Sequence, residues 1–274
     1  MRISGSLIFC LLSFLSSSLH AVEKIVVAAF EYPPIYQNAE EKGLSGDIAV
    51  AAFKAAGIDA DLSFVPVARM IASVANGQFV CGIGGAVLFE SPEIAQKVSV
   101  GSVLQYVSQT FLFDQRKFPA GIPFATLDQV AEYRIGVLYS SGIMKLLEKT
   151  HGLQLDANTT HVGSAKQLQR GRIDIWAIVD LTGHMVMAEL APKEAHHYKH
   201  TPAFHRGDVS LVCSRERDVG GSYQAKFQKG LAVIKKNGTY MKIMAKYYGG
   251  KEQINPDSLP DDMKEVFRSK DRKY

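Results

Sequence analysis

The hydrophobic pattern of the first half of the chain alternates between short apolar runs and stretches with helical spacing. Residues 24–30 (KIVVAAF) are β-branched and apolar, which is typical of a buried strand. Apolar positions three and four residues apart predict helices over 48–56 and 67–75, and strands are predicted over 60–65 and 79–83. This strand–helix–strand–helix–strand order predicts a parallel sheet with right-handed crossovers.

The same order repeats in the second half, after a long β-rich run over 103–113. The predicted elements are a strand at 135–138, a helix from Ile143, a strand at 161–162, a helix capped by Ser164 and ended by Gly171, a strand over 173–179 and a helix over 183–190. One more strand (209–213) and two helices (223–236 and 240–248) follow, and the residues after 250 read as a peripheral polar tail. Two α/β units in one chain predict an α/β protein with two lobes.

The first 21 residues differ from the rest of the chain. Arg2 precedes an apolar run over 7–15, and small residues then lead to Ala21. This pattern predicts a secretory signal (residues 1–21) that is cleaved after Ala21, and hence a periplasmic location. The apolar run is too short to span a bilayer, and Cys10 lies inside it rather than at a lipidation site.

Composition and charge exclude few classes of protein. The 274 residues suffice for one large or two modest domains, and 31 basic against 27 acidic residues give a net charge of +4. Loss of Arg2 with the signal leaves +3, and no run of like charges suggests a nucleic-acid partner. The exported chain keeps Cys81 and Cys213, which either form a disulfide or remain buried thiols in strand-like runs.

A candidate ligand site follows the predicted strand at 135–138. The turn Ser140-Ser141-Gly142 at a helix start offers free N–H groups, two hydroxyls and the positive end of a helix dipole. These groups could hold a small anion such as a carboxylate or a phosphate. In the alternative reading, Ser140 or Ser141 only caps its own helix.

Three further strand ends carry candidate residues. In open parallel sheets, ligands bind beyond the carboxyl ends of the strands. The candidates at these ends are Glu31 and Tyr32 before two prolines, Gly84 and Gly85 after the third strand, and Asp180 in the second lobe. Facing each other, these ends would form a cleft for a small polar ligand. His196, His197, His200 and His205 lack the spacing of a zinc site and are predicted to be solvated loop residues, so we predict no metal and no cofactor.

The order of several short motifs resembles the amino-acid-type periplasmic solute-binding proteins of ABC importers. The matching pieces are Tyr32-Pro33-Pro34 after a strand, Gly43-Leu44-Ser45-Gly46-Asp47 before a helix, and the segments 69–78 (RMIASVANGQ), 134–138 (RIGVL), 171–174 (GRID) and 237–243 (NGTYMKI) with Tyr247-Tyr248. The resemblance implies a two-lobe type II fold with lobe 1 over 22–108, lobe 2 over 109–206, a return to lobe 1 over 207–250 and a tail over 251–274. It also implies that Cys81 and Cys213 lie on neighbouring strands, which favours the disulfide, and that the lobes close on ligand.

The chain departs from this family where an amino acid would be clamped. Family members carry an arginine that pairs with the ligand's α-carboxylate, and Pro92 stands near that position here. Arg69 could supply a cation from the preceding helix, or it is a surface arginine. Asp180 lies where the family's ammonium-binding acid is expected, within one residue, or it caps a helix together with Thr182.

The resemblance predicts a monomeric, non-enzymatic receptor that binds a small polar or anionic solute. Its expected partner is a membrane permease, to which it delivers the solute, or a sensor receptor. A first alternative is a dehydratase-like enzyme on the same fold, with Glu31 or Asp180 as acid or base. No serine lies in a nucleophile motif, so we assign no catalytic residue. A second alternative is a module that acts only in protein–protein contacts.

Overall fold

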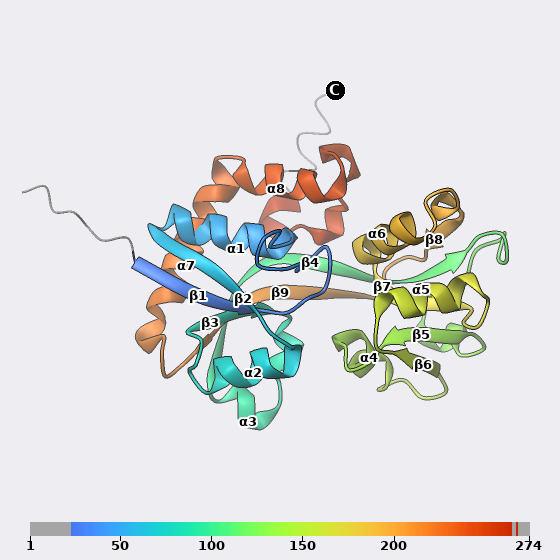
Figure 1. The fold of residues 1–274 in the computed structure, drawn as a ribbon, viewed down its shortest axis with the longest axis horizontal. Coiled ribbons are helices and arrows are strands. Elements are labelled where there is room, and N and C mark those ends of the chain that lie inside the picture. The colour runs from blue at the N-terminus through green and yellow to red at the C-terminus, as the bar shows by residue number, and fades with distance from the viewer. Residues whose placement is uncertain (1–22, 265–266, 268–274) are drawn as a thin grey trace, which may run out of the picture.

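Two long antiparallel strands join the two halves of the molecule. A computed structural model of the chain describes residues 23–264 and 267, so the predicted signal lies outside the described residues. Strand β4 (Val98–Asp114) and strand β9 (His205–Ser214) pair from Val98 to Gln109 and run from one lobe into the other (Figure 1). The predicted crossing points at 108/109 and 206/207 fall within these two strands.

The order of elements follows the predicted α/β alternation. Lobe 1 contains β1 (Glu23–Ala29), α1 (Leu44–Ala55), β2 (Ile58–Phe64), α2 (Val67–Ala75), β3 (Cys81–Gly84), α3 (Pro92–Ala95), α7 (Ser222–Lys236) and α8 (Thr239–Tyr248). Lobe 2 contains β5 (Arg134–Leu138), α4 (Gly142–Leu147), β6 (Gln154–Asn158), α5 (His161–Gln169), β7 (Ile175–Val179), α6 (Asp180–Leu190) and β8 (Tyr198–His200). The predicted two-lobe α/β architecture is confirmed.

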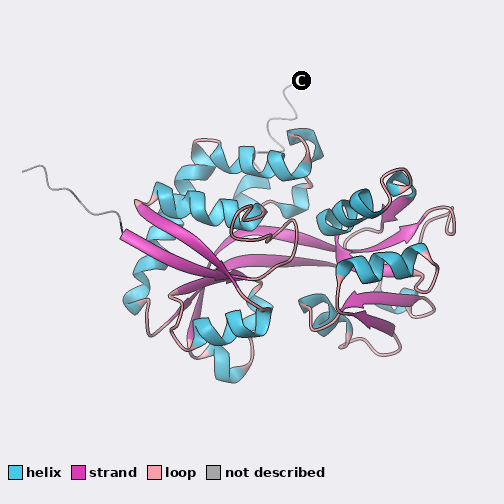
Figure 2. Cartoon of the chain, viewed as in Figure 1, coloured by secondary structure: helices cyan, strands magenta, loops and turns pink. Residues whose placement is uncertain are grey.

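The strands are hydrogen-bonded in the order β2-β1-β3-β9-β4-β7-β5-β6, and β8 pairs with β4. Strands β1, β2 and β3 are parallel, as are β5, β6 and β7, whereas β9 and β4 run antiparallel to their neighbours. The ladders of the two lobes therefore merge into one mixed, twisted sheet through β4 and β9 (Figure 2). Because the crossing strands share main-chain hydrogen bonds with both halves, they also fix how the lobes are joined.

Helices α1 and α7 cover one face of the first lobe and touch each other through a small residue. Gly230 on α7 is buried, and a Cβ atom placed there would lie 1.9 Å from the Ala52 carbonyl oxygen on α1. Phe53 and Phe227 pack beside this contact, with ring centroids 4.9 Å apart. The close approach buries the apolar faces that the helical spacing predicts.

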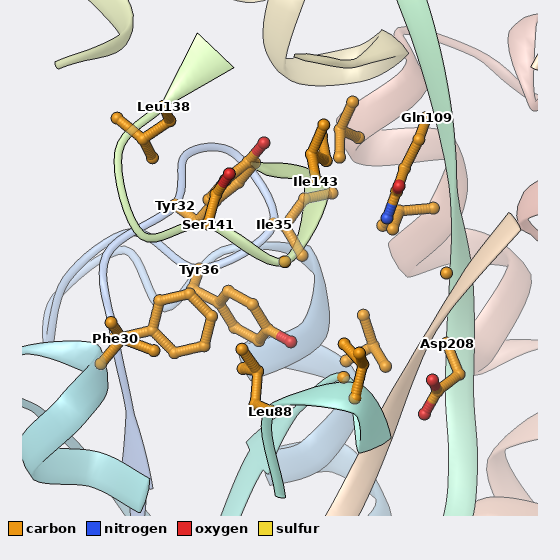
Figure 3. A pocket seen from close by; sticks show the side chains of 18 of the residues that line it. Phe30, Tyr32, Ile35, Tyr36, Leu88, Gln109, Leu138, Ser141, Ile143 and Asp208 are labelled. Carbon is orange, nitrogen blue, oxygen red and sulfur yellow. The ribbon is translucent and has the colours of Figure 1, made fainter. Parts of the chain in front are cut away.

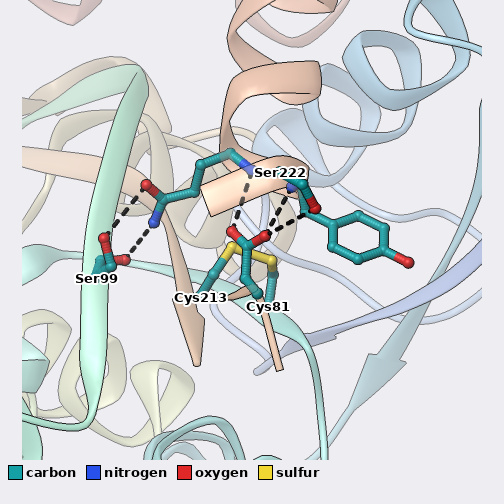
Figure 4. Close-up of a disulfide and its surroundings, with 7 residues drawn as sticks. Cys81, Ser99, Cys213 and Ser222 are labelled. Atoms are coloured by element: carbon teal, nitrogen blue, oxygen red, sulfur yellow. Dashed lines mark hydrogen bonds between the residues drawn. A yellow bond between two sulfur atoms is a disulfide. The ribbon is translucent and has the colours of Figure 1, made fainter. Parts of the chain in front are cut away.

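A disulfide staples the centre of lobe 1 (Figure 4). Cys81 and Cys213 lie opposite each other in the antiparallel pair β3–β9 and are bonded, at a separation of 132 positions in the sequence. The buried Asp218 carboxylate lies against this bridge and accepts the N–H of Tyr223 at 2.8 Å, which anchors the start of α7. The bridge thus joins an early strand to the strand that returns from lobe 2.

The segment after α8 is not peripheral over its described part. Ile254, Leu259 and Met263 are buried in the main core. The Arg206 guanidinium, on β9, donates to the Asp257 carbonyl at 2.7 Å and to the Leu259 carbonyl, so the segment is fastened to a crossing strand. The prediction of a peripheral tail was wrong. It rested on the polar composition of the segment, in which the three buried residues are too widely spaced to form an apolar run.

Two local predictions in lobe 2 are wrong. Residues 161–162 begin helix α5 instead of forming a strand, and Thr160 caps this helix through its side chain, which accepts the N–H of Gly163 at 3.0 Å. Ser164 is therefore buried inside α5. His200, predicted to be a solvated loop residue, lies in β8, where its Nδ1 is 2.7 Å from the Thr110 hydroxyl. Within the described residues, no helix is both long and apolar enough to cross a membrane.

Candidate functional site

A cavity of about 770 Å³ lies between the lobes. Its lining comes from the loop after β1, the start of α2, the turn after β3, both crossing strands and the turn between β5 and α4 (Figure 3). The volume is in the range of sites for small organic molecules. Strand ends of both lobes thus meet at one cavity, as the order of the elements predicts.

The loop after β1 supplies an aromatic wall. Pro33 and Pro34 interrupt the strand, and the Tyr32 N–H donates to the Tyr36 carbonyl at 2.8 Å, which folds the loop back on itself. The rings of Phe30 and Tyr36 pack in a tilted arrangement with centroids 4.7 Å apart, and both residues line the cavity together with Tyr32 and Glu31. This wall suits the apolar or aromatic body of a ligand.

Tyr32 also reaches the second lobe. Its ring meets that of His161, at the start of α5, edge to face with centroids 4.6 Å apart. Burial lowers the pKa of His161 to about 4, so its imidazole is neutral at pH 7. Val87 of lobe 1 approaches the turn of lobe 2 as well, since a Cβ on Gly142 would lie 3.5 Å from it. The lobes therefore touch through the Tyr32–His161 ring pair and come close to each other at Val87 and Gly142.

The turn of lobe 2 lines the cavity with Ser140, Ser141 and Gly142. Ser140 adopts a left-handed conformation with φ of 57°, and Ser141 caps α4 by accepting the N–H of Met144 at 3.1 Å. The capping alternative therefore holds for the Ser141 hydroxyl. The anion cradle at this turn stays a prediction.

Two crossing-strand residues that the sequence did not single out also face the cavity. Asp208 on β9 accepts the Ala86 N–H at 3.1 and 3.3 Å and the Ser210 hydroxyl at 2.6 Å. Gln109 on β4 also lines the cavity, and its Oε1 is buried without a hydrogen-bond partner in the described part of the chain (Figure 3). The two crossing strands therefore add polar groups to a largely apolar cavity.

The remaining predicted residues lie outside the cavity lining. Arg69 is exposed on α2, and Gly84 is buried at the end of β3. Asp180 accepts a hydrogen bond from Asn255 Nδ2 at 2.8 Å and another from the Leu181 N–H at 2.7 Å. Burial raises the pKa of this carboxyl group, although its hydrogen bond from Asn255 acts in the opposite direction. The structure therefore brings together Glu31, Tyr32, Gly85 and the turn, but not these three.

The cavity's arginine is already engaged. Arg206 Cζ lies 3.4 Å from the centre of the Tyr106 ring, and its guanidinium donates to two carbonyls of the C-terminal segment and pairs with Asp261 at 3.2 Å. It lines the cavity, but its charge is directed toward that segment. No described lining residue therefore reproduces the arginine clamp expected for an α-carboxylate.

The comparisons with known proteins agree with this geometry. The family of bacterial extracellular solute-binding proteins, family 3, matches residues 24–250, and the chain belongs to this family. No curated protein sequence matches the chain.

Solved structures of similar fold are binding proteins and sensors of low sequence identity. A histidine kinase sensor domain with similarity to periplasmic binding proteins superposes with a TM-score of 0.66 at 16% identity, covering 83% of this chain and 96% of that one. The arginine-, lysine-, histidine-binding protein ArtJ from Geobacillus stearothermophilus gives 0.65 at 18%, covering 89% and 100%. The GluR0 ligand-binding core from Nostoc punctiforme, in complex with L-glutamate, gives 0.64 at 15%, covering 81% and 98%. At these identities the likeness shows the type II periplasmic-binding-protein fold.

Proposed function

We propose that the protein is an extracytoplasmic receptor that closes its two lobes on one small organic solute and presents the closed form to a membrane partner. The observation that supports this proposal most directly is the cavity of about 770 Å³ lined by strand ends of both lobes. A solute held there touches both halves, so it favours the closed form by as much as it binds that form better.

The partner is either an importer permease or a sensor. Family membership supports delivery to an importer, and the histidine kinase sensor domain of similar fold supports a sensory role. The dehydratase alternative has less support, because Asp180, one of its two candidate acids, is bonded to Asn255 rather than exposed to the cavity. Turnover of a prephenate-like acid by the purified protein would support the enzyme hypothesis instead.

A solute screen on the mature protein tests the proposal. At one hundred times its dissociation constant, a ligand adds about 2.7 kcal/mol to the free energy of unfolding. For a chain of this size we expect a rise of about 5–10 °C in the unfolding midpoint. Small-angle scattering should then show a smaller radius of gyration with ligand than without. If a broad panel of amines, amino acids, organic acids and neutral solutes produces neither effect, the receptor function is wrong.

A further inference from the structure

We infer that the receptor selects a cationic solute, an organic ammonium or guanidinium with an apolar body, and that Asp208 on β9 binds its charged group. This inference rests on the proposed function and names the ligand class of the same cavity. It differs from the anion that the sequence predicts at the turn of residues 140–142 and from the acid position at Asp180 that the family resemblance implies.

The position and the free acceptor capacity of Asp208 are the first argument. A carboxylate offers about four acceptor positions. The Ala86 N–H and the Ser210 hydroxyl together make three contacts to Asp208, so one position remains for a donor from the cavity. These bonds also fix the carboxylate, because both come from the sheet or from the turn beside it. A pre-oriented, partly buried carboxylate is suited to bind an ammonium group.

A buried hydroxyl beside Asp208 is the second argument. Tyr36 is 3% exposed, lines the cavity, and its hydroxyl has no hydrogen-bond partner within the described residues. Burial raises the pKa of the Tyr36 hydroxyl and the Asp208 carboxylate adds to this effect, whereas the nearby Ser45 hydroxyl, which accepts from Gln105 Nε2 at 2.9 Å, acts in the opposite direction. In Figure 3 the Tyr36 hydroxyl and the Asp208 carboxylate point into the same part of the cavity. An unpaired buried hydroxyl costs free energy, which a ligand donor would offset.

The charge balance of the lining is the third argument. Glu31, Glu90 and Asp208 contribute three carboxylates, whereas the cations are Lys149 and Arg206. Arg206 donates hydrogen bonds to the Asp257 and Leu259 carbonyls and pairs with the Asp261 carboxylate, so its charge is partly neutralised outside the cavity. Three carboxylates against two cations give these lining residues a formal charge of −1, which favours a cation over a carboxylate in the cavity.

The glycine at the turn explains how the site forms. A Cβ on Gly85 would lie 3.2 Å from the Asp208 carbonyl oxygen, closer than most side-chain contacts. A glycine at this position lets the chain after β3 approach β9, so that the Ala86 N–H reaches the Asp208 carboxylate. Gly85, one of the two glycines predicted for the site, thus supports the acid rather than the ligand directly.

Matched ligand sets test the inference on the purified mature protein. Each set contains a primary amine, the corresponding alcohol and the corresponding carboxylate. The members of a set share an isobutyl, phenylethyl or indolylethyl body and differ only in the polar end group. Thermal shift and calorimetry should show that at least one amine binds at least tenfold tighter than its alcohol, while the carboxylate of the same body does not bind. Alcohols or carboxylates that bind as well as the amines would overturn the inference and leave the receptor function intact.

Variants then locate the charge. Asp208→Asn should weaken the amine at least tenfold and leave the alcohol unchanged, whereas Asp61→Asn, the same change at an exposed position of β2 outside the cavity lining, should leave both unchanged. Tyr36→Phe keeps the buried ring and should weaken the amine about threefold, which provides a test if Asp208→Asn does not fold. If the amine retains its affinity in Asp208→Asn or in Tyr36→Phe, the assignment is wrong. If no amine binds, the inference falls, and the receptor function falls only if the broader panel fails as well.

Discussion

Breaking the bond between Cys81 and Cys213 should cost the protein a large part of its stability. The bridge spans 132 residues, so it restricts a long loop of the unfolded chain. For a loop of this length the chain-entropy relation gives about 5 kcal/mol at 25 °C, and removal of a native disulfide from small domains costs about 2–5 kcal/mol. We therefore expect reduction to lower the free energy of unfolding by about 2–5 kcal/mol and the midpoint temperature by about 5–20 °C.

Guanidinium unfolding of the wild-type protein, with and without a thiol reductant, measures this difference. The double variant Cys81→Ala/Cys213→Ala is the control, because it lacks the bridge and should not respond to the reductant. A loss of less than about 1 kcal/mol on reduction would refute the entropic reasoning, since the loop would then already be restricted in the unfolded state. An equal response of the double variant would show that the reductant acts elsewhere.

Three further predictions concern packing, pH and the C-terminal segment. Gly230→Ala should destabilise the fold by about 1–3 kcal/mol in thermal unfolding, because the new Cβ meets the Ala52 carbonyl; unchanged stability would mean that α1 and α7 can separate freely. His161 has its pKa lowered to about 4 against about 6.5 when unfolded, so the unfolded state binds more protons between these values and stability falls as the pH drops through them. The contribution of His161 to the slope of unfolding free energy against pH, up to about 1.4 kcal/mol per pH unit, should be absent in His161→Phe. An identical pH profile of stability in the variant would contradict this. A double-mutant cycle of Asn255→Ala and Asp180→Ala should give a coupling of about 1–2 kcal/mol, whereas strictly additive effects would deny the hydrogen bond between them.

The sequence predicted the elements whose apolar residues repeat, and it failed where a structural element is polar. Strand β6 is Gln154–Asn158 (QLDAN), which contains too few apolar residues to suggest a strand. The apolar pair at 161–162 looked like a strand, yet the Thr160 cap just before it begins a helix. A single Thr–X–X–Gly cap is a weak signal beside a β-branched residue, so the local pattern favoured the wrong element.

Half of the cavity could be predicted from the chain order, and the other half depends on strand pairing. Tyr32 and Ser141 follow strands in their own lobes, so the rule of strand ends was sufficient to find them. Asp208 lies inside a strand and belongs to no motif. Its role depends on the antiparallel register that places Gly84 opposite Ser210, which joins residues more than a hundred positions apart in the sequence. Likewise, nothing in the local sequence around Asp180 indicates that Asn255 will bond to it.

The attachment of residues 254–264 to Arg206 has a practical consequence for work on this protein. The family match ends at residue 250, which invites expression of a chain cut there. Such a cut would remove the two carbonyls and the carboxylate that bind the guanidinium, and would leave Arg206 stacked on the Tyr106 ring with a charge that this carboxylate no longer neutralises. Affinities measured on the shortened protein would then report an altered electrostatic potential, and an anion bound to it could be mistaken for the natural solute.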